Sequence, residues 1–393
     1  MSGALLQPVG RHRASADLLR AVRGEELVGS YAAVADASEL VALAVHHRIA
    51  PQLRRQLDLQ GLAIAEVGRL ALDTAARNTA LHNLRARGAL AWLSVTLEGL
   101  PWFVIKGPAL SFTVYDTPEE RTFTDLDVVV PPSSLAVVLQ RLRAAGARVH
   151  DRDWQHLIDQ RAGEMTLSSP YGITIDLHWR LHNDIVLCGH GTLPIEELLE
   201  RSRVVRIDDR PIRTLGGADA LAHLAVHTCG SGGDRLSWFL DVDRFVRRGG
   251  LDGAGDGAQV RRCIDRHGAA LAVDLVLDRA RILFGTPRPH PLGPKARGSL
   301  PWRGLTRCTR WVGGPPRTLG GPTLDRLVLR SVRADAIASA RALATKTRLA
   351  TRGRRDAQLG PPTVVPALGT APSGDRANLE HLITAVVGHG DAW

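Results

Sequence analysis

The sequence predicts an α+β fold in which a short run of strands lies between helical regions. Over the first hundred residues, apolar side chains recur every three or four positions, as in helices that bury one face. From Leu100 the pattern changes to short apolar runs closed by glycine or proline, which is typical of buried strands. Helical spacing returns from Ala218. We therefore expect a helical region at 1–95, a core at 96–215, a second helical region at 216–287 and a C-terminal region at 288–393.

The helical prediction for the N-terminal region rests on three groups of apolar residues, each of which would share one helix face. They are Leu40, Leu43 and Ala44, then Ala63, Val67, Leu70 and Ala71, then Leu90, Leu93 and Leu97. Alanine is frequent and proline is rare in this region, which also favours helix.

The core begins with an apolar run, Trp102–Ile105, that ends at Lys106-Gly107-Pro108. This order predicts a buried strand, a tight turn and then a short helix from Ala109 to about Val114. A second strand is expected at Leu126–Val130, where two prolines close it. A helix capped by serine and stopped by glycine is expected to follow at Leu135–Ala145.

The next two strands are predicted to pair as a hairpin. Met165–Ser168 and Ile173–Trp179 flank Ser169-Pro170-Tyr171-Gly172, a segment rich in turn residues. Because side chains alternate along a strand, Asp176 and His178 share the face opposite the apolar residues of their strand. We therefore expect Asp176 to point away from the apolar layer.

The net charge is +10, from 50 lysine and arginine residues against 40 aspartate and glutamate residues. A basic total favours nucleic acid or a membrane surface as a partner. Here the excess lies in the C-terminal region, where 17 basic and 6 acidic residues give +11. A basic helix is expected there from Thr323 to about Leu349, with few aromatic residues that could stack on bases. A solvated helix face and a surface for nucleic acid or an acidic partner both fit this pattern.

The four cysteines are too widely spaced for a CxxC zinc motif or a disulfide framework. No run of about 18 apolar residues predicts a membrane span, and the N-terminus lacks the apolar core of a signal peptide. The sequence therefore predicts a soluble cytoplasmic protein without a membrane partner.

The most informative segment is Asp125-Leu126-Asp127, which leads into three valines. Residues i and i+2 of a strand share one face, so the two carboxylates would repel each other without a cation between them. Mg²⁺ prefers oxygen ligands and is commonly shared between carboxylates and substrate phosphates. Asp176 on a neighbouring strand would complete a set able to hold two Mg²⁺ ions, or Mn²⁺, for nucleotidyl or phosphoryl transfer.

The same aspartates could instead cap a loop or carry solvated charge, which is the commoner role of an isolated Asp-x-Asp. Their context favours the metal. Upstream, a strand, Lys106-Gly107 and a helix follow one another, as they do where backbone approaches phosphate at a helix N-terminus. Downstream, Asp176 stands among apolar strand residues, where an unpaired carboxylate costs free energy.

Three segments in order, Ile105–Leu110, Arg121–Val130 and Ile175–Trp179, resemble the uncharacterised nucleotidyltransferase family of the polymerase-β-like superfamily. The resemblance covers roughly residues 95–250. It implies a mixed, mostly antiparallel sheet with helices on one side, binding of an NTP such as ATP through Mg²⁺, and transfer of a nucleotidyl group to an acceptor. Its catalytic metal ligands would be Asp125, Asp127 and Asp176.

One departure concerns the turn that holds phosphate, where the superfamily usually has Gly-Ser or Gly-Gly. Here Pro108 follows Gly107 and has no N–H to donate. Lys106 could supply a point charge to the triphosphate instead, or it could end the strand and face solvent. Arg121 could contact phosphate, or it could pair with a neighbouring glutamate.

Several residues could line a pocket for the acceptor. His178 shares a strand face with Asp176, and it could orient that acid, contact the acceptor or be a structural histidine. His223 and His227 are four apart on a predicted helix without the Glu of a His-Glu-x-x-His motif, which favours core or interface histidines. His227 and Asp241 could still line the pocket.

We therefore expect an Mg²⁺-dependent nucleotidyltransferase, with Lys106, Gly107 and Arg121 near the phosphates of the NTP. The alternative is a catalytically inactive relative that keeps the fold as an interaction or nucleic-acid-binding module. The proline after Gly107, which departs from the usual phosphate-binding turn, favours this alternative. The presence of all three acids favours catalysis. The acceptor is left open among small molecules, peptides, proteins and RNA, because specificity resides in the flanking regions.

Overall fold

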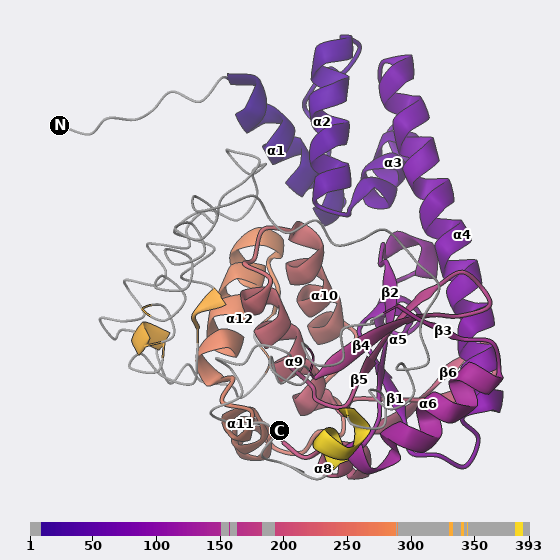
Figure 1. The fold of residues 1–393 in the computed structure, drawn as a ribbon. Coiled ribbons are helices and arrows are strands. Elements are labelled where there is room, and N and C mark those ends of the chain that lie inside the picture. The colour runs from indigo at the N-terminus through magenta and orange to yellow at the C-terminus, as the bar shows by residue number, and fades with distance from the viewer. Residues whose placement is uncertain are drawn as a thin grey trace, which may run out of the picture.

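The structure is a computed structural model that describes residues 9–150, 157, 163–182, 193–287, 289, 330–332, 339–341, 344 and 382–387. Within these ranges, a seven-stranded sheet lies beside a group of helices (Figure 1). Helices come first along the chain, the strands follow, and helices return after the sheet. The predicted α+β fold is confirmed.

The N-terminal part consists of four helices, α1 to α4, which span Val9–Arg23, Val34–His46, Ala50–Leu59 and Glu66–Thr96. The groups at Leu40 and at Leu90 are buried as predicted. The middle group is not, because Val67 and Leu70 are 49% and 61% exposed, while Leu72 is buried. The middle and last groups lie on one continuous helix of 31 residues, α4, in which no proline interrupts the backbone hydrogen bonds.

The sheet has the strand order β3-β4-β5-β2-β1-β7-β6. Its strands are β1 Phe103–Ile105, β2 Asp125–Val129, β3 Arg148–Val149, β4 Glu164–Ser168, β5 Thr174–His178, β6 Arg203–Ile207 and β7 Arg210–Thr214. The pairs β2–β5 and β1–β7 are parallel, and the other four pairings are antiparallel. The predicted hairpin is β4–β5, and the expectation of a mixed, mostly antiparallel sheet is confirmed.

The register of the central strands places the predicted acids together. Asp127 on β2 lies opposite Asp176 on β5 and opposite Ile105 on β1. Because β2 and β5 are parallel neighbours in register, the side chains of Asp127 and Asp176 leave the same face of the sheet. The end of β1, the start of β2 and the middle of β5 therefore meet at one place.

Helices cover both faces of the sheet, so the one-sided arrangement expected from the resemblance is wrong. On one face, the second half of α4 and α6 (Leu135–Ala144) pack through Leu90, Leu93 and Val138 against strand residues such as Val128. On the other face, α8 (Ile195–Glu200) packs through two residues of its own against Phe103, Ile105 and Val129. The alternation of each strand supplies apolar side chains to both layers.

A second core joins the two helical regions of the sequence. Buried residues of α1, α2, α3 and the first half of α4 pack with those of the helices that follow the sheet. These later helices are α9 Gly217–Gly230, α10 Leu236–Arg247, α11 Gly257–Arg266 and α12 Ala270–Phe284 (Figure 1). The short helix α5, Gly107–Ser111, adds Leu110 to this core directly after β1. The helical regions at either end of the sheet thus form one packed body.

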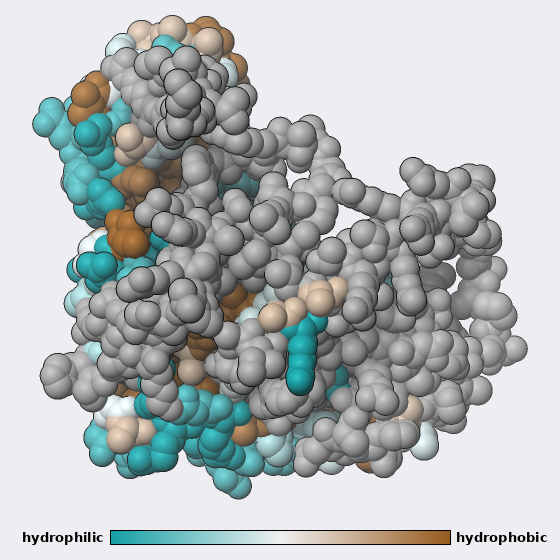
Figure 2. Space-filling model, turned by 90° about the vertical axis from the view of Figure 1, so that its left-hand side faces the viewer, coloured by the Kyte–Doolittle hydropathy of each residue, from teal (hydrophilic) through white to brown (hydrophobic). Residues whose placement is uncertain are grey.

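The chain returns to the sheet near its C-terminus, where residues 382–387 are helical and bury Leu382 and Val386 in the core beneath α4 and α6. The basic helix predicted at Thr323–Leu349 lies almost wholly outside the described residues. Within the described part, no helix has the length and apolar character needed to cross a membrane. On the face drawn in Figure 2, hydrophobic and hydrophilic residues of the described part are interspersed.

Two leucines of α4 give a matched test of this packing. Leu93 is fully buried and Leu84, on the same helix, is 61% exposed. We expect Leu93→Ala to lower the free energy of unfolding by about 2–5 kcal/mol, because it removes buried methyl groups and leaves a cavity. Leu84→Ala should change it by less than about 0.5 kcal/mol. Urea denaturation followed by circular dichroism measures both, and equal effects would contradict the assigned face of α4.

Candidate active site

A cavity of about 240 Å³ lies at the turn after β1 and the start of β2. Seven of the nine predicted site residues line it, namely Lys106, Gly107, Arg121, Asp125, Asp127, His227 and Asp241. The other two, Asp176 and His178, lie beside it on β5 and approach it through Asp127. The cavity is also lined by Arg48, from the connection between α2 and α3, and by Arg235 and Trp238 at the start of α10.

Asp127 is the most enclosed of the three predicted metal ligands and is 5% exposed. Its Oδ1 lies 2.9 Å from Nζ of Lys106 and 3.1 Å from Nε2 of His178. Burial alone would raise the pKa of Asp127, but the charge of Lys106 and the hydrogen bond with His178 hold this pKa far below its ordinary value. The carboxylate is therefore ionised and fixed in orientation. One of the two placements predicted for Lys106 was at the strand end facing solvent. The structure instead pairs Lys106 with Asp127.

His178 lies between two carboxylates. Its Nδ1 is 3.0 Å from Oε2 of Glu164, while Nε2 contacts Asp127. The Nδ1 contact is an ionic approach without the alignment of a hydrogen bond. Burial lowers the pKa of His178, and Asp127 and Glu164 raise it above its ordinary value. The histidine thus orients Asp127, on the neighbouring strand, and has no recorded contact with Asp176.

Asp176 and Asp125 carry negative charge without an ion-pair partner among the described residues. Asp176 accepts a hydrogen bond of 3.1 Å from Oγ1 of Thr166, and Oγ1 of Thr124 lies 3.3 Å from Oδ2 of Asp125. Burial raises the pKa of Asp176 to about 6, and Glu164, Asp125 and Asp127 add to the shift. Carboxylates gathered with too little positive charge are the environment that a divalent cation stabilises. The residues present therefore fit the Mg²⁺ that the sequence predicts.

The turn after β1 has an uncommon backbone conformation. Lys106 has φ 50° and ψ −129°, and Gly107 has φ 25°. The positive φ of Gly107 favours glycine, whereas a Cβ there would make an ordinary contact of 3.4 Å with the carbonyl oxygen of Asp125, at the first residue of β2. Strained backbone of this kind persists only where the surroundings hold it, and it is common at functional sites.

Arg121 holds this turn against α10. Its Nε and Nη2 each donate to one oxygen of Asp241 at 2.8 Å, and its Nη1 donates to the carbonyl oxygen of Gly107 at 3.1 Å. Tyr115 donates to the same carboxylate at 2.7 Å. Burial opposes the charge of Arg121, but Asp241 keeps its pKa above the ordinary value. Arg121 therefore pairs with a residue far along the chain and with neither neighbouring glutamate.

Two further residues that line the cavity, Arg48 and Arg235, were not predicted from the sequence. Arg48 precedes all the strands of the sheet along the chain, and Arg235 follows them. No motif connects them, because the apolar patterns of the two helical regions predict helices but do not predict which residues the two regions bring together. One signal was available. Arg48 follows the end of an amphipathic helix, where a chain usually has glycine. It adopts φ 56°, as glycine would.

A larger hollow of about 660 Å³ lies among α1, α3, α10 and α12. Its arginines already have partners, as in the pairs Arg55 with Glu120 and Arg247 with Asp243. It contains neither the aspartates of β2 nor the glycine turn. We therefore assign the chemistry to the smaller cavity at the sheet.

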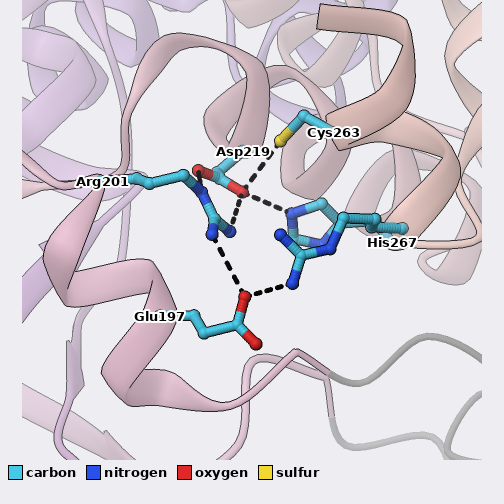
Figure 3. Close-up of polar contacts among 6 residues, drawn as sticks. Glu197, Arg201, Asp219, Cys263 and His267 are labelled. Atoms are coloured by element: carbon cyan, nitrogen blue, oxygen red, sulfur yellow. Dashed lines mark hydrogen bonds and ion pairs between the residues drawn. The ribbon is translucent and has the colours of Figure 1, made fainter. Parts of the chain in front are cut away.

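A second cluster brings together Asp219, Cys263 and His267, whose ligand atoms all lie within 4.8 Å of one another (Figure 3). Oδ1 of Asp219 is 2.7 Å from Nε2 of His267 and accepts from the thiol of Cys263 at 3.2 Å. Arg201 donates to both oxygens of Asp219, at 3.0 and 3.1 Å. Glu197 in turn pairs with Arg201. The network thus ties the end of α8 to α9 and α11.

This cluster is better suited to stability than to metal binding. The guanidinium of Arg201 already takes both oxygens of Asp219, and a metal ion on the same oxygens would be repelled by it. Burial and the charge of Asp219 raise the pKa of the Cys263 thiol to about 12, so the group is protonated at neutral pH.

The comparison with known protein families agrees with the fold. The model of the family described as uncharacterised nucleotidyltransferase matches residues 33–285, and the chain belongs to that family. The match extends beyond residues 95–250, which the sequence resemblance covers, and adds α2, α3 and most of α4 on one side and α11 and α12 on the other. The family description points to nucleotidyl transfer and hence to a transferase. No curated protein and no solved structure matched the chain.

The role of Asp219 can be tested through the pH dependence of stability. Burial raises the pKa of Asp219, but His267 and Arg201 lower it below its ordinary value of 3.8. The stabilisation is therefore complete above about pH 4 and is lost as pH falls toward the lowered pKa. We expect Asp219→Asn to lower the free energy of unfolding by about 2 kcal/mol at pH 7. This difference in unfolding free energy between parent and variant should become smaller below about pH 4.

Urea denaturation at pH 7, 5 and 3 measures this gap. Asp36→Asn makes the same chemical change on an exposed residue of α2 and should have no comparable effect. A gap for Asp219→Asn that stays constant down to pH 3 would contradict the assigned ion pair.

Proposed function

We propose that this protein is an Mg²⁺-dependent nucleotidyltransferase that moves a nucleotidyl group from an NTP to an acceptor. The observation that carries the proposal is the pair Asp125 and Asp127, which line the cavity beside the strained Lys106-Gly107 turn, together with Asp176, which lies opposite Asp127 on the neighbouring parallel strand. Two carboxylates of one strand face and a third on the parallel neighbour form the ligand set that such transfer uses. Membership of the family supports the reaction class.

Asp125, Asp127 and Asp176 would hold the metal, which neutralises phosphate charge and lowers the pKa of the attacking hydroxyl when bound. The chain's own residues prepare these ligands. Lys106 and His178 both contact Oδ1 of Asp127, and this leaves Oδ2 as the oxygen without a recorded partner.

The turn at Gly107 is the second working part of the site. Arg121 fixes it by holding the Gly107 carbonyl oxygen and Asp241 together. We propose that this arrangement keeps the backbone close to the start of β2, where the phosphates of the NTP enter. Arg121 and Asp241 are then positioning residues, because their hydrogen-bonding groups already serve each other.

The acceptor would enter beside His227 and Trp238. Both line the cavity, and their rings meet edge to face with centroids 5.8 Å apart. Burial, the largest influence, and the charge of Lys106 lower the pKa of His227 well below its ordinary value, so the imidazole is neutral. A neutral imidazole next to an aromatic ring suits a polar, uncharged part of an acceptor. His178, behind Asp127, does not line this cavity.

Binding of nucleotide and metal tests the assignment of the acids. We expect Asp125→Asn and Asp127→Asn to weaken Mg²⁺-dependent ATP binding at least about tenfold, which corresponds to about 1.4 kcal/mol. Isothermal titration calorimetry with each NTP, with and without Mg²⁺, measures this change. Asp36→Asn serves as the matched control on an exposed residue.

The half-buried Asp125 is the cleaner variant, because loss of the Asp127 charge leaves Lys106 and His178 without their shared partner. If both variants bind nucleotide and metal as tightly as the parent, the proposed metal site is wrong. Absence of NTP binding by the parent itself would favour the alternative of a silent interaction module, which Pro108 in the glycine turn suggests.

The group transferred and its recipient are read from one further experiment. The protein is incubated with labelled ATP and host-cell extract, and the products are examined by mass spectrometry. Nucleotidyl transfer adds a nucleoside monophosphate to the acceptor, whereas phosphoryl transfer adds a single phosphate, so the mass shift separates the two reactions.

A further inference from the structure

Two arginines enter the cavity without a carboxylate partner. Arg48 lies in the connection between α2 and α3, and Arg235 immediately precedes α10. Both are half-buried. Among the described residues, neither guanidinium has a carboxylate oxygen within 4.0 Å. The guanidinium carbon of Arg235 lies over the ring of Trp238, 5.5 Å from the ring centroid.

His47 brings the two arginines together. Its Nδ1 accepts from the backbone N–H of Leu236, and its carbonyl oxygen accepts from the backbone N–H of Ser237, both at 3.3 Å. The end of α2 and the start of α10 are thereby attached to each other. Arg48 and Arg235, the chain neighbours of His47 and Leu236, reach the same cavity as a consequence.

The backbone at Arg48 adds an independent observation. In the described part of the chain, four residues other than glycine have a positive φ. Asp208 and Asp209 form the tight turn between β6 and β7, where such values are usual. The other two, Arg48 and Lys106, both line the cavity. Glycine at position 48 would fit this conformation without strain, so the arginine there has a cost in stability.

Two arginines and one aspartate of the cavity lining remain when the residues that pair with each other are set aside. Lys106 pairs with Asp127, and Arg121 pairs with Asp241. Without these internal pairs, the lining retains the guanidinium groups of two arginines and the carboxylate of Asp125. Burial lowers the pKa of Arg48, and the repulsion from Arg235 lowers it further. A ligand that presents several anionic oxygens to the arginines and a cation to Asp125 matches this arrangement.

We propose that Arg48 and Arg235 bind the polyphosphate chain of the nucleotide and hold it against the metal site at Asp125. The inference rests on the proposed function and adds its phosphate-binding groups. It moves the phosphate contacts from Lys106 and Arg121, whose charges are already paired, to two residues of the flanking helices. The nucleotide site is then built jointly by the sheet and by both helical regions.

Calorimetric titration tests this assignment with three probes: Mg²⁺–ATP, AMP, and inorganic tripolyphosphate in the presence of EDTA. We expect Arg48→Gln and Arg235→Gln each to weaken binding of ATP and of tripolyphosphate at least tenfold, about 1.4 kcal/mol. The affinity for AMP, which lacks the polyphosphate, should fall much less in these variants. Arg143→Gln removes the same charge from an exposed position on α6 and should change nothing.

The metal-free probe separates this inference from the proposed function. Asp125→Asn should weaken binding of Mg²⁺–ATP but should not weaken binding of metal-free tripolyphosphate, because it removes a repelling charge. Two results together would support the arginine assignment and contradict the metal site. Arg48→Gln and Arg235→Gln would weaken binding of tripolyphosphate, while Asp125→Asn would leave Mg²⁺–ATP binding unchanged.

Arg48→Gly guards against a trivial loss of folding. Glycine relieves the positive φ, so we expect a melting temperature at or above that of the parent together with the same loss of ATP affinity. Unchanged ATP and tripolyphosphate affinities in Arg48→Gly and Arg235→Gln would overturn the inference. So would an effect of these variants confined to the acceptor, seen as a raised KM for acceptor alone, because the arginines would then bind a different anion.

Discussion

The buried pair between Arg121 and Asp241 is the interaction on which the site depends. It crosses from the loop before β2 to α10, and through the Gly107 carbonyl oxygen it also fixes the turn after β1. Breaking one partner would leave the other charge buried and unpaired, so the pair acts as a single unit. The turn, the first residue of β2 and the start of α10 keep their relative positions because this one carboxylate serves Arg121 and Tyr115 together.

Much of the sheet could be predicted because its signals are local. The run before Lys106, the alternation around Asp176 and the prolines after β2 each depend on near neighbours, and the strands lie where these patterns place them. The family was recognised from the same segments. A neighbouring strand was predicted for Asp176, but the parallel pairing and the register that place it opposite Asp127 were not, because side-chain alternation does not determine how strands pair.

What could not be predicted depends on contacts between distant segments. Asp241, the partner of Arg121, is 120 residues away in the chain, and no local sequence pattern near either residue predicts that they pair. The buried face of α4 was also wrongly predicted at Val67 and Leu70, because α2 and α3 pack on that helix and their positions decide which of its residues are buried. Arg48 and Arg235 belong to the same class, since the contact at His47 that joins them spans 189 residues.

The insertion of Leu382 and Val386 into the sheet core has a consequence for the order in which the protein matures during its synthesis. The last strand of the sheet, β7, ends at Thr214, so the ribosome makes all seven strands long before it makes these two side chains. A nascent chain that has completed its strands still exposes part of the apolar face beneath α4 and α6. These two side chains reach the sheet core only after the whole chain between β7 and residue 382 has been made.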